Sequence, residues 1–172
     1  KKGKRVIKDY GEFRCYATKA EVLYPGVYEL RKKNFEFTQK KNFVNMVTGG
    51  IEYFELELIR IHSSGDFYDF GYFQKWYEIA QINSNTIFYG YSKQASFVKY
   101  LIDNPLNNFK LNYSMGGLMD NYAIKYNLPK TYVMTKLNAH TMEDVQLACT
   151  PEDYTNDFPL IMNGETFKIK FH

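Results

Sequence analysis

Apolar residues follow two alternating patterns along most of the chain. Nearly continuous apolar runs predict four strands, at Leu56–His62, Thr86–Tyr91, Phe109–Ser114 and Thr131–Thr135. Between these runs, apolar residues recur with helical spacing, which predicts helices within 70–80, 95–102 and 119–126. Strands that alternate with helices are typical of βα units, and nearly continuous apolar strands fit a sheet covered on both faces. The pattern predicts an α/β fold with a mostly parallel sheet of repeated βα units, as an open sheet or a partial barrel.

The two ends of the chain differ from this repeat. A long basic helix is expected to begin at Pro25, where the missing N–H of proline costs nothing, and to end at Gly49 and Gly50. Residues 166–171 alternate between polar and apolar side chains, which predicts a half-exposed strand at a sheet edge, close to the C-terminus. With 172 residues, the chain is expected to form a single α/β domain over 1–172 with a basic helical N-terminal region at 1–50.

Polar residues gather where the predicted strands end. In parallel α/β folds, ligands bind beyond the carboxyl ends of the strands, because loops from several strands converge there. We therefore expect one pocket at this edge of the sheet. The candidate catalytic residues are His62, Asp66 and Lys93, and the candidate ligand-binding residues are Ser63, Ser64, Gly65, Ser92, Ser114, Gly116 and Gly117.

These residue types suit chemistry on an anionic ligand. His62 would act as a general acid or base with Asp66 as its partner, and Lys93 would neutralise developing negative charge. Bare N–H groups of the glycine pair would cradle a phosphate. Each feature also has a structural explanation: Asp66 or Asp69 can cap a helix, the histidine can be a satisfied strand end, the glycines can form a turn, and the lysine can be an exposed loop residue. Both interpretations stay open.

Charge is unevenly distributed along the chain. Residues 1–44 contain 12 Lys and Arg against 5 Asp and Glu, a balance of +7, and the remaining residues have a balance of −4. A basic end favours an anionic partner such as nucleic acid, with Lys1, Lys2, Lys4 and Arg5 as the candidate contacts. The 16 Tyr and 14 Phe could add base-stacking surface, although a packed core explains most of them. A solvated basic helix face is the alternative.

The positions of cysteine and histidine and the hydropathy of the chain bear on metal sites, on membrane helices and on secretion. Cys15 and Cys149 lie too far apart for a zinc or iron–sulfur pattern, and His140 and His172 stand outside the strand-end pattern, so we expect no metal site and no cofactor. No run approaches the roughly 18–20 apolar residues of a membrane helix, and no secretion leader is recognisable. These features predict a protein of a reducing, cytoplasmic setting that does not engage a membrane.

The central block of the chain resembles the phage gene product 88 family. The stretch RIHSSGDF at 60–67 matches that family's Arg-Ile-His-x-Ser-Gly-Asp-Phe motif, followed by Tyr72, Trp76 and a FYGYSK strand end at 88–93. CYATKAEVLYP at 15–25 and NGETFKIKFH at 163–172 are similar to its upstream and closing segments. The resemblance implies a phage or mobile-element protein that works in a bacterial cytoplasm, and it implies no established chemistry.

Two functions follow from these observations. The first is a pocket-bearing α/β protein, either an enzyme or a binding protein, that takes a small phosphorylated or nucleotide-like anionic ligand at the strand ends. The second is a non-catalytic counter-defence module that binds nucleic acid or a host protein through the basic N-terminal quarter and aromatic residues. A purely structural virion role is least favoured, because it gives no reason for polar strand ends gathered at one edge.

Overall fold

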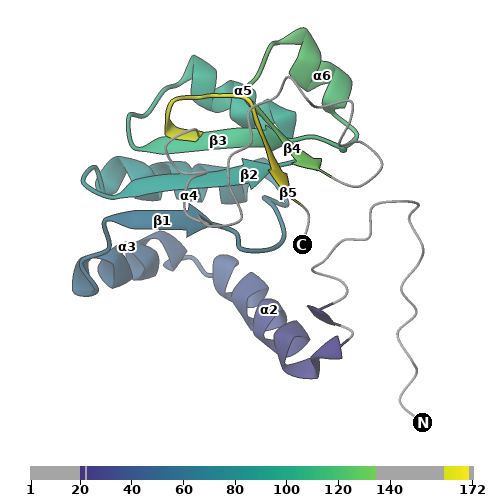
Figure 1. Cartoon of the computed structure of the whole chain (residues 1–172). Helices are drawn as coiled ribbons and strands as arrows, with labels where there is room; N and C mark the ends of the chain where they lie inside the picture. Colours follow the sequence, from purple (N-terminus) through teal and green to yellow (C-terminus); the bar gives the residue numbers. More distant parts are fainter. Residues whose placement is uncertain (1–19, 22, 135–160, 171–172) are drawn as a thin grey trace. The chain divides into compact units, whose positions relative to one another are not determined.

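The computed structural model describes residues 20, 21, 23–134 and 161–170, and the chain divides into two compact units, 1–46 and 47–172. The first unit contributes helix α2 (Pro25–Thr38) and the start of helix α3 (Phe43–Tyr53). The second contains the sheet and its helices (Figure 1). The single-domain organisation stays a prediction.

The expected long basic helix is in fact two helices. Pro25 begins α2 as predicted, but Thr38 Oγ1 donates a 2.7 Å hydrogen bond to Phe35 O, and the next residues form tighter turns before α3 begins at Phe43. Gly49 and Gly50 do not end a helix: they lie within α3. Burial of the apolar side chains of α3, with Ile51 only 5% exposed, outweighs the roughly 1 kcal/mol that each glycine costs in a helix interior.

The sheet is open and parallel, as the strand pattern predicts. Its strands are β1 (Leu58–Ile61), β2 (Ile87–Ser92), β3 (Phe109–Ser114), β4 (Lys130–Met134) and β5 (Phe167–Lys170). Their order in space is their order in the chain, and every pairing is parallel. β5, the expected C-terminal strand, lies at one edge beside β4.

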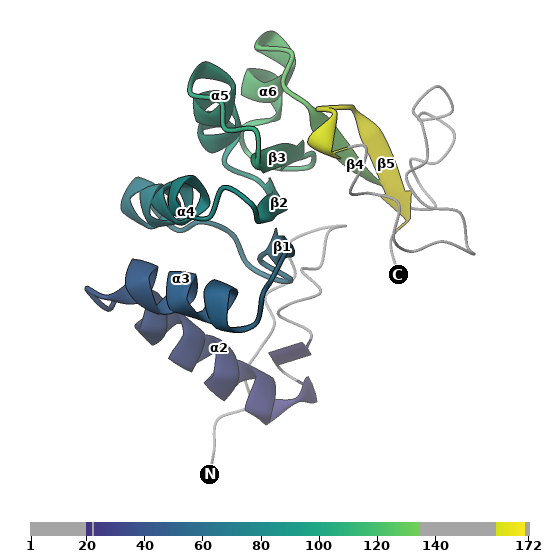
Figure 2. The same ribbon diagram turned by 90° about the vertical axis from the view of Figure 1, so that its left-hand side faces the viewer.

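Three helices connect the strands: α4 (Phe70–Ile82), α5 (Ala95–Asp103) and α6 (Asp120–Lys125). Parallel crossovers are right-handed, so a sheet that always grows in one direction places its connecting helices on one face. Figure 2 shows α4, α5 and α6 on the same side of the strands. Among the described residues, none of the helices combines the length and the hydropathy that a membrane span requires.

Phenylalanine rings form the core between these helices and the sheet. Phe73 of α4 stacks on Phe97 of α5 with a centroid distance of 4.8 Å, and Phe67 meets Phe73 edge-on at 5.4 Å. Phe88 and Phe109 bring β2 and β3 into the same cluster and are fully buried. Much of the aromatic content therefore serves packing, where each buried ring contributes about 1.5–3 kcal/mol.

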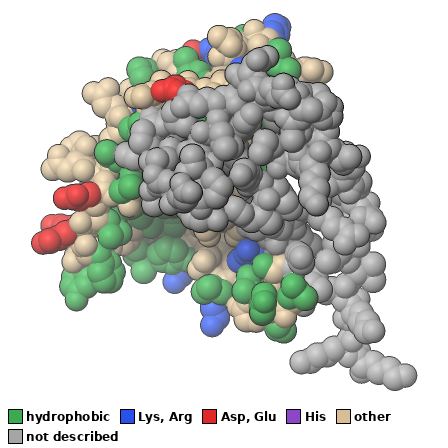
Figure 3. Space-filling view, in the orientation of Figure 1, with side chains coloured by type: hydrophobic (Ala, Val, Ile, Leu, Met, Phe, Trp, Pro, Cys, Tyr) green, Lys and Arg blue, Asp and Glu red, His purple; other side chains and the backbone are tan. Residues whose placement is uncertain are grey.

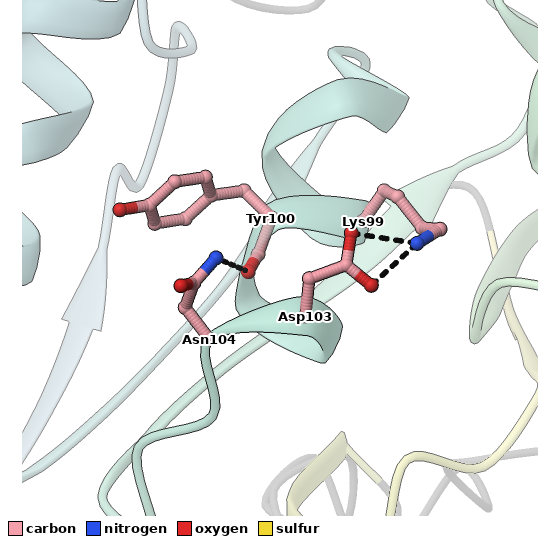
Figure 4. A network of polar contacts seen from close by, with 4 residues as sticks. All are labelled: Lys99, Tyr100, Asp103 and Asn104. Atoms are coloured by element: carbon pink, nitrogen blue, oxygen red, sulfur yellow. Dashed lines mark hydrogen bonds and ion pairs between the residues drawn. The ribbon is translucent and has the colours of Figure 1, made fainter.

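The far end of α5 is fixed by two local contacts (Figure 4). The Asn104 amide donates a 3.1 Å hydrogen bond to Tyr100 O, and the backbone N–H of Asn104 donates to the same oxygen at 2.8 Å. Lys99 donates to Asp103 one turn later, with Nζ 2.6 Å from Oδ2. The Tyr77 hydroxyl donates to Asn104 O at 3.3 Å and joins α4 to this end of α5.

Candidate functional site

The carboxyl ends of β1, β2 and β3 lie at one edge of the sheet, as Figure 1 shows by the shared direction of the arrows. We call this the carboxyl edge; it comprises residues 62–69, 92–94 and 114–120. Most of the residues that the sequence predicts for a site lie there. Their roles as catalytic or ligand-binding groups stay predictions.

Asp66 joins the loop after β1 to the end of β2. Its Oδ1 accepts hydrogen bonds from Phe67 N and Ser92 Oγ, both at 2.7 Å, and its Oδ2 accepts one from Lys93 N at 2.6 Å. Ser92 is 1% exposed, and its hydroxyl also accepts from Gln94 N. The Asp66 carboxylate therefore holds the loop in place.

The two aspartates of this loop separate clearly. Asp69 is the N-cap of α4 and accepts a 2.7 Å hydrogen bond from Tyr72 N. Asp66, the other capping candidate, bonds instead across to the next strand. The capping explanation applies to Asp69 and not to Asp66.

His62 has an unusual backbone and an unusual side chain. Its φ of +60° lies in the left-handed region, which costs an L-residue other than glycine about 1–2 kcal/mol. Its Nε2 lies 3.0 Å from the Tyr72 hydroxyl, and its ring packs edge-on against Phe67. Its Nδ1 is buried and has no hydrogen-bond partner in the described part of the chain.

The electrostatics of His62 follow from this position. Burial lowers the pKa of His62 below its usual 6.5, although the nearby Asp66 carboxylate acts in the opposite direction. Burial also raises the pKa of Tyr72, so that its hydroxyl stays protonated. A neutral imidazole next to a protonated phenol can accept a hydrogen bond at Nε2 and donate one from Nδ1.

Lys93 points along the edge toward β3. Its Nζ donates to Ser114 O at 3.1 Å and to Met115 O at 3.0 Å, with Ser114 Oγ at 3.5 Å. The ammonium thus bridges the ends of β2 and β3. Lys93 and Ser114 are brought together, as expected for one edge.

The glycine pair binds an anion, but that anion belongs to the chain itself. Asp120, in the first turn of α6, accepts hydrogen bonds from Gly117 N at 2.9 Å and from Gly116 N at 3.1 Å. It also accepts one from the Tyr113 hydroxyl at 2.7 Å. Burial, followed by this hydrogen bond, raises the pKa of Tyr113. Residue 117 must be small, because a Cβ there would lie 2.7 Å from the Tyr113 oxygen.

Asp120 was not predicted from the sequence. The available signal was an acidic residue three positions after a glycine pair, at the start of a short helix. Tyr72 as the partner of His62 was also missed, since the two are ten residues apart on a loop and a helix.

The remaining predicted residues are less informative. Ser63, Ser64 and Gly65 form the connecting loop, in which Gly65 has a φ of +86° that favours glycine. Within the described ranges, no three or more His, Cys, Asp and Glu side chains gather as metal ligands. The other predicted positions lie outside the described residues: Lys1, Lys2, Lys4, Arg5, Cys15, His140, Cys149 and His172.

The sheet topology also limits what the carboxyl edge can form. Open α/β sheets bind ligands in the crevice where the strand order reverses. The order from β1 to β5 never reverses, so no such crevice arises between the described strands. A hollow of about 460 Å³ lies at the opposite edge, lined by Thr48, Ile51, Glu52 and residues 55–57 and 82–86. We call it the amino-edge groove.

Comparison with known families and proteins gives one match. Residues 11–160 match the family described as Gene product 88. No curated protein and no solved structure matches the chain. The match covers most of the sequence, including β1, the Asp66 loop, α4 and the end of β2. The chain belongs to the Gene product 88 family.

Proposed function

We propose that this protein comes from a phage or another mobile element, acts in the bacterial cytoplasm, and binds a small phosphorylated or nucleotide-like ligand at the carboxyl edge. Family membership supports the origin. The convergence of three strand ends with a histidine, a lysine and two glycines supports the place. One observation carries the proposal, and it concerns His62.

His62 bears two energetic costs in one residue. Its left-handed backbone is unfavourable, and a buried polar atom without a partner costs about 1–3 kcal/mol. Backbone strain of this kind clusters at functional sites. A ligand oxygen that accepts a hydrogen bond from Nδ1 would remove the second cost. Because Nδ1 is buried, the groups that cover it must shift to admit that oxygen.

The Asp120 contacts indicate how an anion would be held. Successive N–H groups such as those of Gly116 and Gly117 form a concave anion-binding nest, and Asp120 occupies it. A ligand phosphate would take the place of this carboxylate. Lys93 would then lie close to it, since a Cβ on Gly116 would be 3.8 Å from Lys93 Nζ.

Titration with pyrophosphate and ADP tests the proposal. We expect Asp120→Asn to bind pyrophosphate at least several-fold more tightly than the parent chain, because the competing carboxylate is gone. His62→Asn keeps a residue that tolerates the left-handed backbone and is expected to lose most of the binding. The matched control is Asp103→Asn, which removes the same charge from an exposed pair on α5.

Three results would refute the ligand site. These are no binding of either anion by the parent chain or by Asp120→Asn, unchanged binding in His62→Asn, or the same gain in Asp103→Asn as in Asp120→Asn. The urea unfolding midpoint of each variant separates a lost site from a lost fold.

A further inference from the structure

The amino-edge groove is strongly negative. Glu52, Glu55 and Glu57 all line it and are exposed. The C-terminal ends of α3 and α4 also meet there, and a helix C-terminus carries a partial negative charge. Among the described residues, none of the three carboxylates has an ion-pair partner. A cation placed in the groove would offset this repulsion.

Glu55 occupies a position where the backbone favours glycine. Leu56 N donates to Ile51 O and Glu55 N to Glu52 O, the two hydrogen bonds of a Schellman motif at the end of α3. The residue between the helix and Leu56 must then be left-handed, and Glu55 has a φ of +51°. Folding alone is better served by glycine there, so the glutamate adds charge to the groove at a cost in stability.

The groove is also apolar. Ile82 is 54% exposed and Leu56 is 41% exposed, and both line the hollow. Next to them along the chain, Tyr53 and Phe54 are 81% and 67% exposed and meet edge-on. Figure 3 shows acidic side chains beside a group of hydrophobic ones at the left, over the end of α3 and the start of β1. This combination suits a cationic head on an aliphatic stem.

Hydrogen bonds between the walls make the groove preformed. The Asn83 amide donates to Thr48 Oγ1 at 3.2 Å and joins the end of α4 to α3. Thr86 Oγ1 donates to Leu56 O at 2.7 Å and joins the segments that precede β2 and β1. The Asn108 amide lies within 3.0 Å of three carbonyl oxygens, one in the last turn of α4 and two in the connection from α4 to β2. A rigid site loses little entropy when it is filled.

We propose that the amino-edge groove docks a peptide segment of a partner protein that carries arginine or lysine next to apolar side chains. The occupant is basic because the groove has two helix C-termini and three carboxylates that form no ion pair with the residues that the structure describes. It is a peptide because the apolar surface continues past the hollow onto Tyr53 and Phe54, farther than a single amine reaches.

Fluorescence anisotropy with a labelled peptide of alternating arginine and leucine tests the docking. A peptide with glutamate in place of arginine is the matched probe, and we expect it to bind at least about tenfold more weakly. The triple variant Glu52→Gln, Glu55→Gln and Glu57→Gln should weaken binding of the arginine peptide by about tenfold or more, since an exposed charge pair contributes up to about fivefold. Ile82→Ser should weaken it as well.

Two controls match these changes. Glu78→Gln removes a charge from an exposed position on α4 that does not line the groove, and Ile102→Ser removes a half-exposed side chain from α5. We expect both to bind the arginine peptide like the parent chain. Equal losses in these controls would overturn the proposal, as would equal binding of the two peptides.

The other occupants have their own signatures. Displacement of the peptide by spermidine, together with unchanged binding in Ile82→Ser, would assign the groove to small polyamines and overturn the proposal. A dimer in native mass spectra that the triple variant loses would assign it to a second copy of this chain, with the same consequence. The test is independent of the carboxyl-edge ligand, because none of these variants touches that edge.

Discussion

Replacing Asp66 should cost the protein much more stability than replacing Asp69, although the two lie three residues apart in one loop. In Asp66→Ala, the N–H groups of Phe67 and Lys93 and the hydroxyl of Ser92 lose an acceptor that holds them at 2.6–2.7 Å. An unsatisfied donor costs about 1–3 kcal/mol, with the upper part of the range for buried groups such as Ser92. Together these losses predict a decrease of about 3–5 kcal/mol in the free energy of unfolding.

Asp69→Ala removes a single helix cap and should cost about 1 kcal/mol. Asp66→Asn should fall between the two, since its amide keeps one acceptor oxygen but turns an N–H₂ toward a donor. Urea unfolding followed by circular dichroism measures all three. If Asp66→Ala costs no more than Asp69→Ala, the cross-strand role of this carboxylate is wrong.

Three further changes test other parts of the structure. Burial lowers the pKa of His62 in the folded chain below its usual 6.5, so the unfolded chain takes up the proton first as the pH falls. The free energy of unfolding should therefore decrease as the pH drops below about 6.5 and level off below the folded-state pKa. Urea titrations of His62→Asn should lack this decrease. Gly49→Ala should stabilise the chain by about 0.5–1 kcal/mol, because Gly49 lies within α3 and a Cβ there has open space around it. Gly65→Ala should destabilise the chain by about 1 kcal/mol or more, because Gly65 has a φ of +86°. Urea unfolding midpoints of the two variants that move in the same direction would contradict this. Glu55→Gly should raise the free energy of unfolding by about 1 kcal/mol, since it removes the backbone strain of a left-handed glutamate and one of three neighbouring negative charges. A lower melting temperature of this variant would contradict the argument that the Glu55 backbone is strained.

The strand pattern predicted the sheet well, because a strand that is buried in a sheet is visible in the sequence as a short run of apolar residues. Phe109–Ser114 has the expected bounds, and the other three predicted strands are displaced by one or two residues at their ends. The prediction of one long N-terminal helix was wrong. The break between α2 and α3 depends on local hydrogen bonds around Thr38 and on the packing of α3, which helical spacing does not reveal.

The sequence predicted which candidate residues lie close together better than it predicted their hydrogen bonds. The order of the strands placed Asp66, Ser92, Lys93 and Ser114 together, since parallel strands share an edge. The sequence did not predict which polar group accepts the hydrogen bond of which donor. The carboxylate of Asp120 accepts the hydrogen bonds of the glycine nest. The chain contains several other acidic residues, so only the tertiary structure identifies Asp120 as the acceptor. The missing reversal of strand order also needed the structure, since the same βα repeat fits either topology.

The coincidence of strand order and chain order bears on how the protein is made. As the chain leaves the ribosome, β1, β2, β3 and β4 emerge in the sequence in which they pair, so each new strand meets an edge that is already available. No strand up to β4 waits for a later one to be inserted beside it, which keeps loop closures short and folding rapid. β5 follows only after a further stretch of more than thirty residues from the end of β4 at Met134 to Phe167. Among the strand edges that a later strand covers, that of β4 therefore stays open longest during synthesis. A nascent chain of this protein is therefore most vulnerable to wrong strand pairing late in translation, just before its last strand arrives.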